Sequence, residues 1–148
     1  TYLINRGDQA LALADAVGPN CGVCLDLFHM NIEESDILGA FRKCKGRIYD
    51  VHIADNNRFA AGLGQIDWPR IVATLKEVGY DGALTNEFVA PVDRTPAAPY
   101  PEMVERHPVD ISPEQLKFIQ DHGSSVLTEK FYTDQMRITA EALLPLIK

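Results

Sequence analysis

The sequence lacks several features that define large classes of protein. No apolar run approaches the roughly 18 residues that a transmembrane helix needs. Residues 1–6 have neither the basic start nor the long apolar stretch of a signal peptide. Basic residues are also few: 14 lysines and arginines stand against 21 aspartates and glutamates, which gives a formal net charge of −7. Since nucleic-acid binding needs clustered Lys and Arg, we do not expect nucleic acid as a partner. Since no apolar run is long enough to span a membrane, we do not expect a membrane partner either.

Cysteine is scarce and odd in number, with Cys21, Cys24 and Cys44. An odd count without a secretory signal favours reduced thiols and a cytoplasmic protein. Cys21 and Cys24 form a CxxC pair, a spacing found in redox and zinc sites. No second pair completes a four-sulfur site, and Cys24 lies inside an apolar run. We therefore interpret both as small residues at the start of a strand, where free Cys is commonly buried.

What the sequence does contain is a regular alternation of helical and strand-like segments. Apolar residues at helical spacing, caps at Asp36 and Asp67, and glycine stops predict the helices. In chain order we predict a helix over 7–17, a strand over 22–27, a helix over 35–43, a strand over 48–54, a polar loop over 55–66, a helix over 67–78, a strand over 83–89, a helix over 112–121 and a helix over 130–144. This order is typical of an α/β fold with a parallel sheet and crossover helices.

Proline sets one segment apart from this pattern. Five of the nine prolines lie between residues 91 and 108, which excludes a regular element there. We predict a single partial domain over 1–148. It comprises an α/β core over 1–90, a Pro-rich insertion with a helix over 91–128, and a final helix over 129–148.

Three apolar runs each end in a side chain that can hold a metal ion: Asp26, His52 and Glu87. Carboxylate oxygen and neutral imidazole nitrogen are ligands of hard or borderline divalent cations. The separations of 26 and 35 residues leave room for one helix and two turns each. In parallel neighbouring strands the three groups emerge at one sheet edge, where α/β barrels have their active sites. The sequence therefore predicts a divalent metal site there.

Three strands cannot close a barrel, which needs eight strands and typically about 250 residues. The fold is therefore either a small open sandwich or part of a larger barrel. The opening helix over 7–17, with no strand before it, favours the second. Exposed sheet edges and an open core face lead us to expect a homo-oligomer or association with an N-terminal half.

Four motifs carry a resemblance to a known family. They are LDLFHMNIEE over 25–34, VHIADNNR over 51–58, GLGQIDW over 62–68 and GYDG over 79–82. In this order and spacing they resemble the xylose-isomerase-like sugar isomerase/epimerase superfamily, most of all its ketose 3-epimerases (the D-tagatose/D-psicose group). The resemblance spans residues 1–90 and returns in the last helix. It implies the C-terminal half of a TIM (β/α)8 barrel, incomplete without an N-terminal half.

The resemblance also implies a ligand set. The family holds its metal with four side chains at strand ends, and Asp26, His52 and Glu87 match the last three. The first is a Glu that in relatives directly precedes a segment like Thr1–Tyr2–Leu3, so we expect this chain alone to bind metal weakly and to be inactive. Mn²⁺ is the first expectation, and Mg²⁺, Co²⁺ or Zn²⁺ also suit these ligands.

The family's substrate-contacting His and Arg match His29 and Arg58, so these are the expected contacts to a small sugar or sugar phosphate. Epimerisation beside a ketose carbonyl removes a proton from carbon and returns it on the other face. A divalent cation stabilises the enediolate as a Lewis acid, and two carboxylates serve as base and acid. Glu87 is the expected catalytic group as well as a ligand. The long Pro-rich stretch after it departs from the family pattern, which leaves the sugar unnamed.

Other functions remain open. A hydroxypyruvate- or inosose-type isomerase or dehydratase uses the same scaffold. A metal phosphoesterase of the abasic-site endonuclease type shares the barrel but needs more histidine ligands and a basic face, against four histidines and a net charge of −7 here. A non-catalytic half-barrel is the third alternative. For single residues the structural alternatives are a cap for Asp26, a core histidine for His52 and a salt bridge for Glu87.

Overall fold

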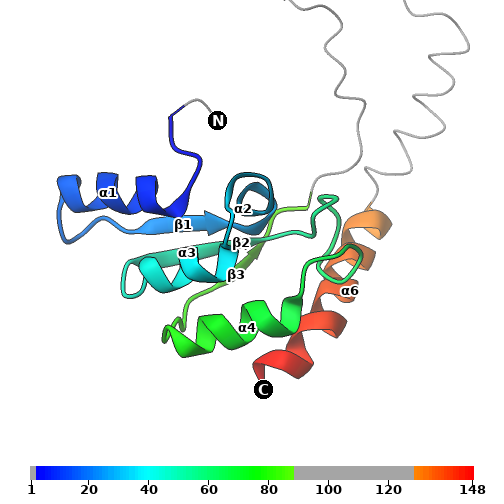
Figure 1. Ribbon diagram of the computed structural model, residues 1–148. Helices are drawn as coiled ribbons and strands as arrows, with labels where there is room; N and C mark the ends of the chain where they lie inside the picture. Colours follow the sequence, from blue (N-terminus) through cyan, green and yellow to red (C-terminus); the bar gives the residue numbers. More distant parts are fainter. Residues whose placement is uncertain (1–2, 89–128) are drawn as a thin grey trace, which may run out of the picture. The chain divides into compact units, whose positions relative to one another are not determined.

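The computed structural model describes residues 3–88 and 129–148. The chain divides into two compact units, Thr1–Val89 with Gln135–Lys148, and Ala90–Asp134. The elements in chain order are α1 (Gly7–Val17), β1 (Val23–Asp26), α2 (Leu27–Glu33), α3 (Ile37–Lys43), β2 (Ile48–Ile53), α4 (Trp68–Glu77), β3 (Leu84–Asn86) and α6 (Glu129–Ile147) (Figure 1). The helix predicted over 112–121 lies outside the described residues.

The three strands form one parallel sheet in the order β1-β2-β3. This confirms the α/β fold with a parallel sheet. In the register, His52 lies beside Asp26 on one side and beside Thr85 on the other. The backbone N–H of Glu87 donates to the carbonyl of Ile53 at 3.0 Å, so Glu87 continues the pairing one step past β3. The carboxyl ends of the three strands therefore meet at one edge.

The two faces of the sheet differ in chemistry because side chains alternate along a strand. One face packs against the helices, and its Val23, Leu25, Val51 and Ile53 side chains are at most 3% exposed. Each such burial contributes about 1.5–3 kcal/mol. The other face carries partly or fully exposed, mostly polar side chains: Cys24, Asp26, Asp50, His52, Thr85 and Glu87. The sheet thus has a helix-covered apolar face and an open polar face.

The helix starts follow the predicted caps. Asp36 accepts a hydrogen bond from Gly39 N at 2.9 Å at the start of α3, and Asp67 accepts one from Arg70 N at 3.2 Å at the start of α4. Such caps are worth about 1 kcal/mol each. Pro69 sits in the first turn of α4, where its missing N–H costs no hydrogen bond.

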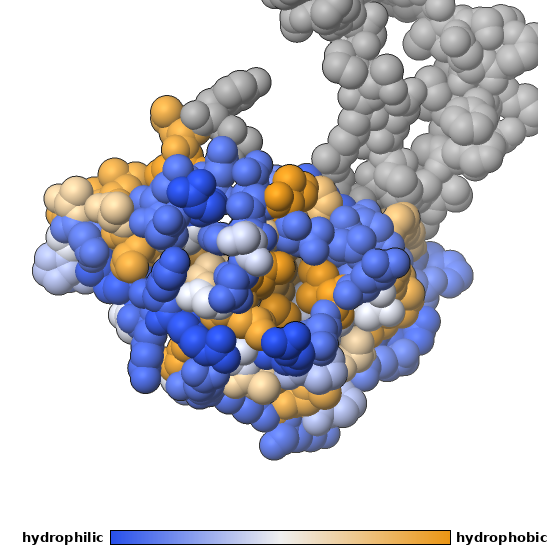
Figure 2. Space-filling view, in the orientation of Figure 1, coloured by the Kyte–Doolittle hydropathy of each residue, from blue (hydrophilic) through white to orange (hydrophobic). Residues whose placement is uncertain are grey.

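At α1, apolar side chains reach the surface, with Leu13 51% and Val17 67% exposed (Figure 2).

All three strand predictions were too long, the one over 48–54 by a single residue, and one helix was missed. The strand predicted over 22–27 stops at Asp26, because the Asp26 carboxylate accepts hydrogen bonds from Phe28 N at 2.9 Å and His29 N at 3.3 Å and starts α2 there. The apolar run continues through Leu27 and Phe28, which is why the strand pattern overran the helix start. The strand predicted over 83–89 spans only Leu84–Asn86 within the described residues.

The loop after β2 is organised by one buried carboxylate. Asp55 has no exposed surface and accepts hydrogen bonds from the backbone N–H groups of Asn56, Gly62 and Ile66 and from the Trp68 indole, at 2.9–3.1 Å. Burial acts to raise the pKa of Asp55, but these hydrogen bonds outweigh it and hold the pKa below its usual value. The loop predicted over 55–66 is therefore irregular in outline but fixed in position.

The last helix, α6, contributes to the core of the unit formed by Thr1–Val89 and Gln135–Lys148. In α6, Leu143 is 3% exposed and joins the core, and Gln135 accepts a hydrogen bond from Ala60 N at 2.7 Å. Lys76 of α4 donates to the carbonyl of Leu146 at 2.7 Å. Within residues 3–88 and 129–148, no helix is both long enough and apolar enough to cross a membrane.

Candidate metal centre

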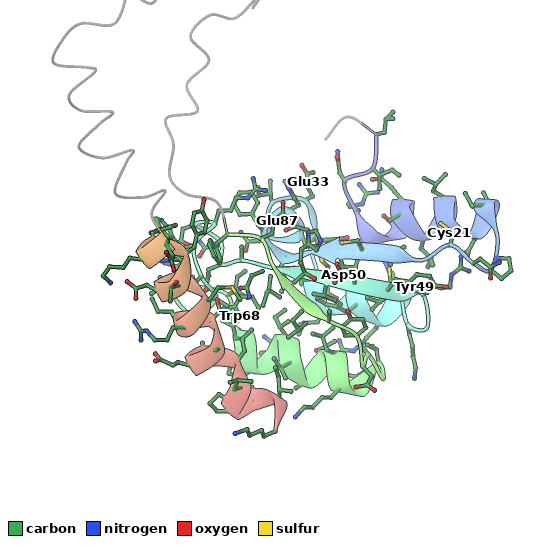
Figure 3. All side chains as sticks on the ribbon, turned by 180° about the vertical axis from the view of Figure 1, so that it is seen from behind. Cys21, Glu33, Tyr49, Asp50, Trp68 and Glu87 are labelled. Atoms are coloured by element: carbon green, nitrogen blue, oxygen red, sulfur yellow. The ribbon has the colours of Figure 1, made fainter. Side chains whose placement is uncertain are left out.

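Three side chains from three separate strands converge at the carboxyl edge of the sheet. The ligand atoms of Asp26, His52 and Glu87 all lie within 4.8 Å of one another. Asp26 ends β1, His52 is in β2, and Glu87 follows β3, as Figure 3 shows for Glu87. All three are partly buried, with side chains 17%, 30% and 39% exposed. Two carboxylates and an imidazole at this separation are a donor set that a divalent cation accepts.

The imidazole of His52 lies between two carboxylates. Its Nδ1 is 2.8 Å from Glu87 Oε2, and its Nε2 is 3.2 Å from Asp50 Oδ2. Burial acts to lower the pKa of His52. The hydrogen bond with Glu87 and the charges of Glu87, Asp50 and Asp26 outweigh burial and raise the pKa above its usual value. In the cation-free state the site therefore favours a protonated imidazole.

The two carboxylates of the cluster lie close enough to affect each other's pKa. Burial raises the pKa of Asp26, and a hydrogen bond with Glu87 raises it further. The same hydrogen bond holds the pKa of Glu87 below its usual value. Two carboxyl groups this close need a proton or a cation between them. The pair therefore fits a site in which a divalent cation takes the place of protons.

Arg58 borders the cluster from the loop after β2. Its Nη2 lies 3.3 Å from Glu87 Oε1, and its guanidinium carbon is 4.7 Å from the centre of the Phe28 ring. The backbone of Arg58 has a φ of 65°, which is uncommon for a residue other than glycine. Its Nε is buried without a hydrogen-bond partner. The side chain is therefore anchored at Glu87 and Phe28, with one buried N–H left unpaired.

His29 lies in the first turn of α2, on the Asp26 side of the cluster. Its side chain is 42% exposed, and its Nε2 is 3.7 Å from Asp26 Oδ2. It helps to line a shallow pocket of about 140 Å³ together with Asn5, Cys24 and Asp26. The structure thus brings Asp26, His52 and Glu87 together, with Arg58 and His29 at their margin. Asp26 has two roles at once. Its carboxylate caps α2, which was the structural alternative for this residue, and it is also part of the cluster.

Sequence reasoning missed Asp50 and Thr85, which lie on the same open face. Asp50 stands two residues before His52, and the two-residue period of a strand places both on one side of the sheet. That spacing was a usable signal.

Cys24 of the CxxC pair lies on the same open face. Cys24 is exposed rather than packed, Cys21 is half-buried, and both are free thiols, as is the buried Cys44. The ligand atoms of Cys24, Asp50 and His52 also lie within 4.8 Å of one another.

Comparisons with known proteins identify the family of the fold. A family model described as a xylose isomerase-like TIM barrel matches residues 1–122. The chain is 42% identical over 86 residues to an L-ribulose 3-epimerase of Mesorhizobium japonicum, and 34% identical over 87 residues to a D-psicose 3-epimerase of Enterocloster bolteae. These matches cover 57% and 58% of this chain but 29% of each relative, so the chain spans under a third of the relatives it matches.

Two solved structures of sugar epimerases also resemble the chain. A D-psicose 3-epimerase from Clostridium cellulolyticum H10, solved with D-tagatose, matches with a TM-score of 0.73 and 26% identity, over 100% of this chain and 46% of that one. An L-ribulose 3-epimerase matches with a TM-score of 0.55 and 40% identity, over 59% of this chain and 30% of that one.

Proposed function

The chain belongs to the xylose isomerase-like TIM-barrel family, and on that basis we propose that it supplies the metal-binding and proton-transfer edge of a ketose 3-epimerase. The observation that carries the proposal is the meeting of Asp26, His52 and Glu87 within 4.8 Å at the carboxyl end of a parallel sheet. The relatives named as D-psicose and L-ribulose 3-epimerases support a small ketose as the substrate.

Asp26, His52 and Glu87 would hold the divalent cation. Once bound, the cation polarises the ketose carbonyl and stabilises negative charge that develops on its oxygen. Mn²⁺ is our proposal for the ion, since two carboxylates and one imidazole suit it, as they also suit Mg²⁺, Co²⁺ and Zn²⁺. The family's fourth ligand, a carboxylate from an N-terminal half, completes the proposed set. For the whole protein we propose a cytoplasmic homo-oligomer or an association with that half.

Glu87 is the proposed proton carrier. In the cation-free chain the neighbouring Asp26, His52 and Arg58 hold the pKa of Glu87 below its usual value, and a bound cation would also favour the ionised carboxylate that accepts a proton from carbon. Its Oε1 lies 3.3 Å from Arg58 Nη2, which orients the carboxylate. Proton return on the opposite face requires a second carboxylate, for which we propose the family's upstream Glu.

Arg58 and His29 are the proposed substrate contacts. The guanidinium of Arg58 is held against the Phe28 ring beside Glu87, and its N–H groups are donors that suit a sugar hydroxyl. The half-exposed imidazole of His29 lies in the pocket next to Asp26 and can hydrogen-bond the carbonyl side of the sugar. These two groups would fix the ketose so that its reacting carbon faces Glu87.

The test is exchange of the C3 proton of D-psicose and L-ribulose with deuterated water in the presence of Mn²⁺. It is measured by NMR on the complete open reading frame that encodes this chain. Glu87→Gln should slow exchange about 10²- to 10⁴-fold. The matched control is Glu141→Gln, a surface glutamate of α6 paired only with Arg137 in the described structure, which should exchange like the wild type. Exchange at the wild-type rate by Glu87→Gln would contradict the proposed role.

A further inference from the structure

We propose that Asp50, held in place by Thr85, is a positioning residue that fixes the imidazole of His52 for the cation. It does so by retaining the proton on His52 Nε2, so that Nδ1 presents its lone pair to the site shared with Asp26 and Glu87. This inference rests on the proposed function, because the cation is the one proposed there. It adds two residues of this chain, neither of which touches the cation.

The position of His52 between its neighbours carries the inference. Nδ1 points to the Glu87 side, 2.8 Å from Oε2, and Nε2 points to the Asp50 side, 3.2 Å from Oδ2. One imidazole cannot direct both nitrogens at the same ion. The nitrogen on the Asp26–Glu87 side is the one available for coordination there, which leaves Nε2 facing the Asp50 carboxylate at ion-pair distance.

Asp50 is itself held by two donors. The hydroxyl of Thr85 lies 2.9 Å from Asp50 Oδ1 and 3.2 Å from Oδ2, and the backbone N–H of Val51 donates to Oδ1 at 2.8 Å. Thr85 is the register partner of His52 on β3, and Asp50 lies two residues before His52 on β2. The pleat of two paired strands therefore puts the hydroxyl, the carboxylate and the imidazole on one face, with Asp50 hydrogen-bonded to Thr85 and at ion-pair distance from His52.

A carboxylate in this position has a known physical effect. A histidine that binds a metal is neutral and carries one N–H, and the group that accepts this N–H decides which nitrogen faces the metal and how the ring is oriented. A negatively charged acceptor also makes the coordinating nitrogen a stronger donor. Loss of such an acceptor typically costs 10- to 100-fold in metal affinity.

Cys24 offers the competing explanation of the same geometry. Its sulfur lies within 4.8 Å of the ligand atoms of Asp50 and His52, so these three residues could hold a thiophilic ion through Nε2. In that arrangement Asp50 is a ligand and not a positioning residue. The two explanations differ in which nitrogen of His52 is metal-bound and in whether Cys24 matters.

The experiment measures Mn²⁺ affinity by calorimetry on the complete open reading frame that encodes this chain, as wild type and as a set of single variants. Asp50→Ala should bind Mn²⁺ 10- to 100-fold more weakly. Thr85→Val should weaken binding by a smaller factor, because it frees Asp50 without removing it. Asp50→Asn, whose amide oxygen still accepts the Nε2 proton, should recover part of the loss. Cys24→Ala should bind like the wild type. Asp81→Ala, at an exposed aspartate before β3, is the matched control and should also bind normally.

The second readout is the state of each His52 nitrogen in the Zn²⁺-loaded chain, from two-bond ¹H–¹⁵N NMR spectra. The inference predicts a metal-bound Nδ1 and a protonated Nε2. A metal-bound Nε2, or a Cys24→Ala loss as large as that of Asp50→Ala, overturns it, as does wild-type affinity in Asp50→Ala. A complete protein that binds no divalent cation contradicts the proposed function too, whereas binding that is insensitive to Asp50 contradicts this inference alone. If Asp50→Ala does not fold, Thr85→Val and Asp50→Asn decide the question.

Discussion

His52 and Glu87 are 35 residues apart in the sequence, yet His52 Nδ1 lies 2.8 Å from Glu87 Oε2. The contact exists because β2 and β3 are parallel neighbours and the intervening α4 returns the chain to the same sheet edge. Asp26 joins them because it lies beside His52 in the register of β1 with β2. The candidate site is therefore a product of sheet topology rather than of any local motif.

Cation affinity should rise with pH across the range in which His52 titrates. The pKa of His52 lies above its usual value, so near neutral pH a proton competes with the cation for the imidazole. We expect Mn²⁺ affinity to increase between about pH 6 and pH 8. Binding should release protons, which calorimetry in buffers of different ionisation enthalpy measures. Affinity that does not change over this range would count against His52 as a ligand.

The cation-free chain should respond to pH in the opposite direction. A raised pKa in the folded state means that the ion pairs of His52⁺ stabilise the fold fully below the unfolded pKa of about 6.5, and that this stability is lost as pH rises through the folded pKa. Urea unfolding without metal should therefore show a decline above neutral pH. His52→Gln should remove that decline.

Asp55→Ala should be among the most destabilising substitutions in the described part of the chain. It removes the acceptor of four N–H groups and leaves the buried Trp68 indole without its partner. We expect a loss of about 3 kcal/mol or more in the free energy of unfolding. Because the pKa of Asp55 is lowered, the advantage of wild type over Asp55→Asn should be complete above about pH 4 and shrink as pH falls below it.

Urea unfolding of wild type, Asp55→Ala and Asp55→Asn from neutral to acidic pH makes this measurement. Asp67→Ala is a useful reference, since it removes one exposed helix cap and should cost only about 1 kcal/mol. An Asp55→Ala loss no larger than this reference would show that the loop is not organised by the buried carboxylate.

Gly62→Ala should destabilise the fold through both backbone and packing. Gly62 has a φ of 96°, which an alanine adopts only with strain, and a Cβ there would lie 2.9 Å from the Cβ of Ala142 in α6. Gly79 has a φ of 75°, and a Cβ added there would meet nothing within 4 Å, so Gly79→Ala isolates the backbone cost of about 1–2 kcal/mol. Thermal unfolding should rank Gly62→Ala below Gly79→Ala.

The double variant Gly62→Ala/Ala142→Gly separates the two contributions. It relieves the contact with the helix but keeps the backbone strain, and it adds the cost of a glycine inside α6, about 1 kcal/mol. Measured against Ala142→Gly alone, Gly62→Ala should then cost about as much as Gly79→Ala. An undiminished cost would mean that the contact with Ala142 contributes nothing.

Arg58→Lys should affect substrate binding more than cation binding. Lysine keeps the charge but loses the planar group that lies against Phe28 and the N–H that is unpartnered at Nε. In the exchange assay with Mn²⁺, we expect a rise in KM of about tenfold, with Mn²⁺ affinity little changed. The reverse pattern, lost Mn²⁺ affinity at unchanged KM, would place Arg58 in the support of Glu87 instead.

Much of the site was predictable because its residues sit where regular patterns end. Asp26 and His52 lie at or next to the ends of apolar strands, so these ends could be located from residue type and spacing. The starts of two helices could be located in the same way, because Asp36 and Asp67 are typical caps. The convergence of Asp26, His52 and Glu87 followed from assuming parallel neighbours, which the register confirms.

What the sequence did not predict depends on contacts across the fold. The start of α2 at Leu27 could not be predicted, because Leu27 and Phe28 suit a strand and a helix equally. The hydrogen bonds that Asp26 accepts as the cap decide between the two. The role of Asp55 was hidden because its donors lie up to 13 residues away in an irregular loop. The pairing of Asp50 with Thr85 needs the strand register, which no local pattern contains.

The most direct test is a crystal structure of the complete protein that contains this chain, grown with Mn²⁺, with anomalous difference density measured near the manganese absorption edge. We expect one strong peak bounded by Asp26, His52 and Glu87, with Nδ1 of His52 facing the ion. A strong peak at Cys24 and Asp50, or no peak among these three side chains at millimolar Mn²⁺, would contradict it.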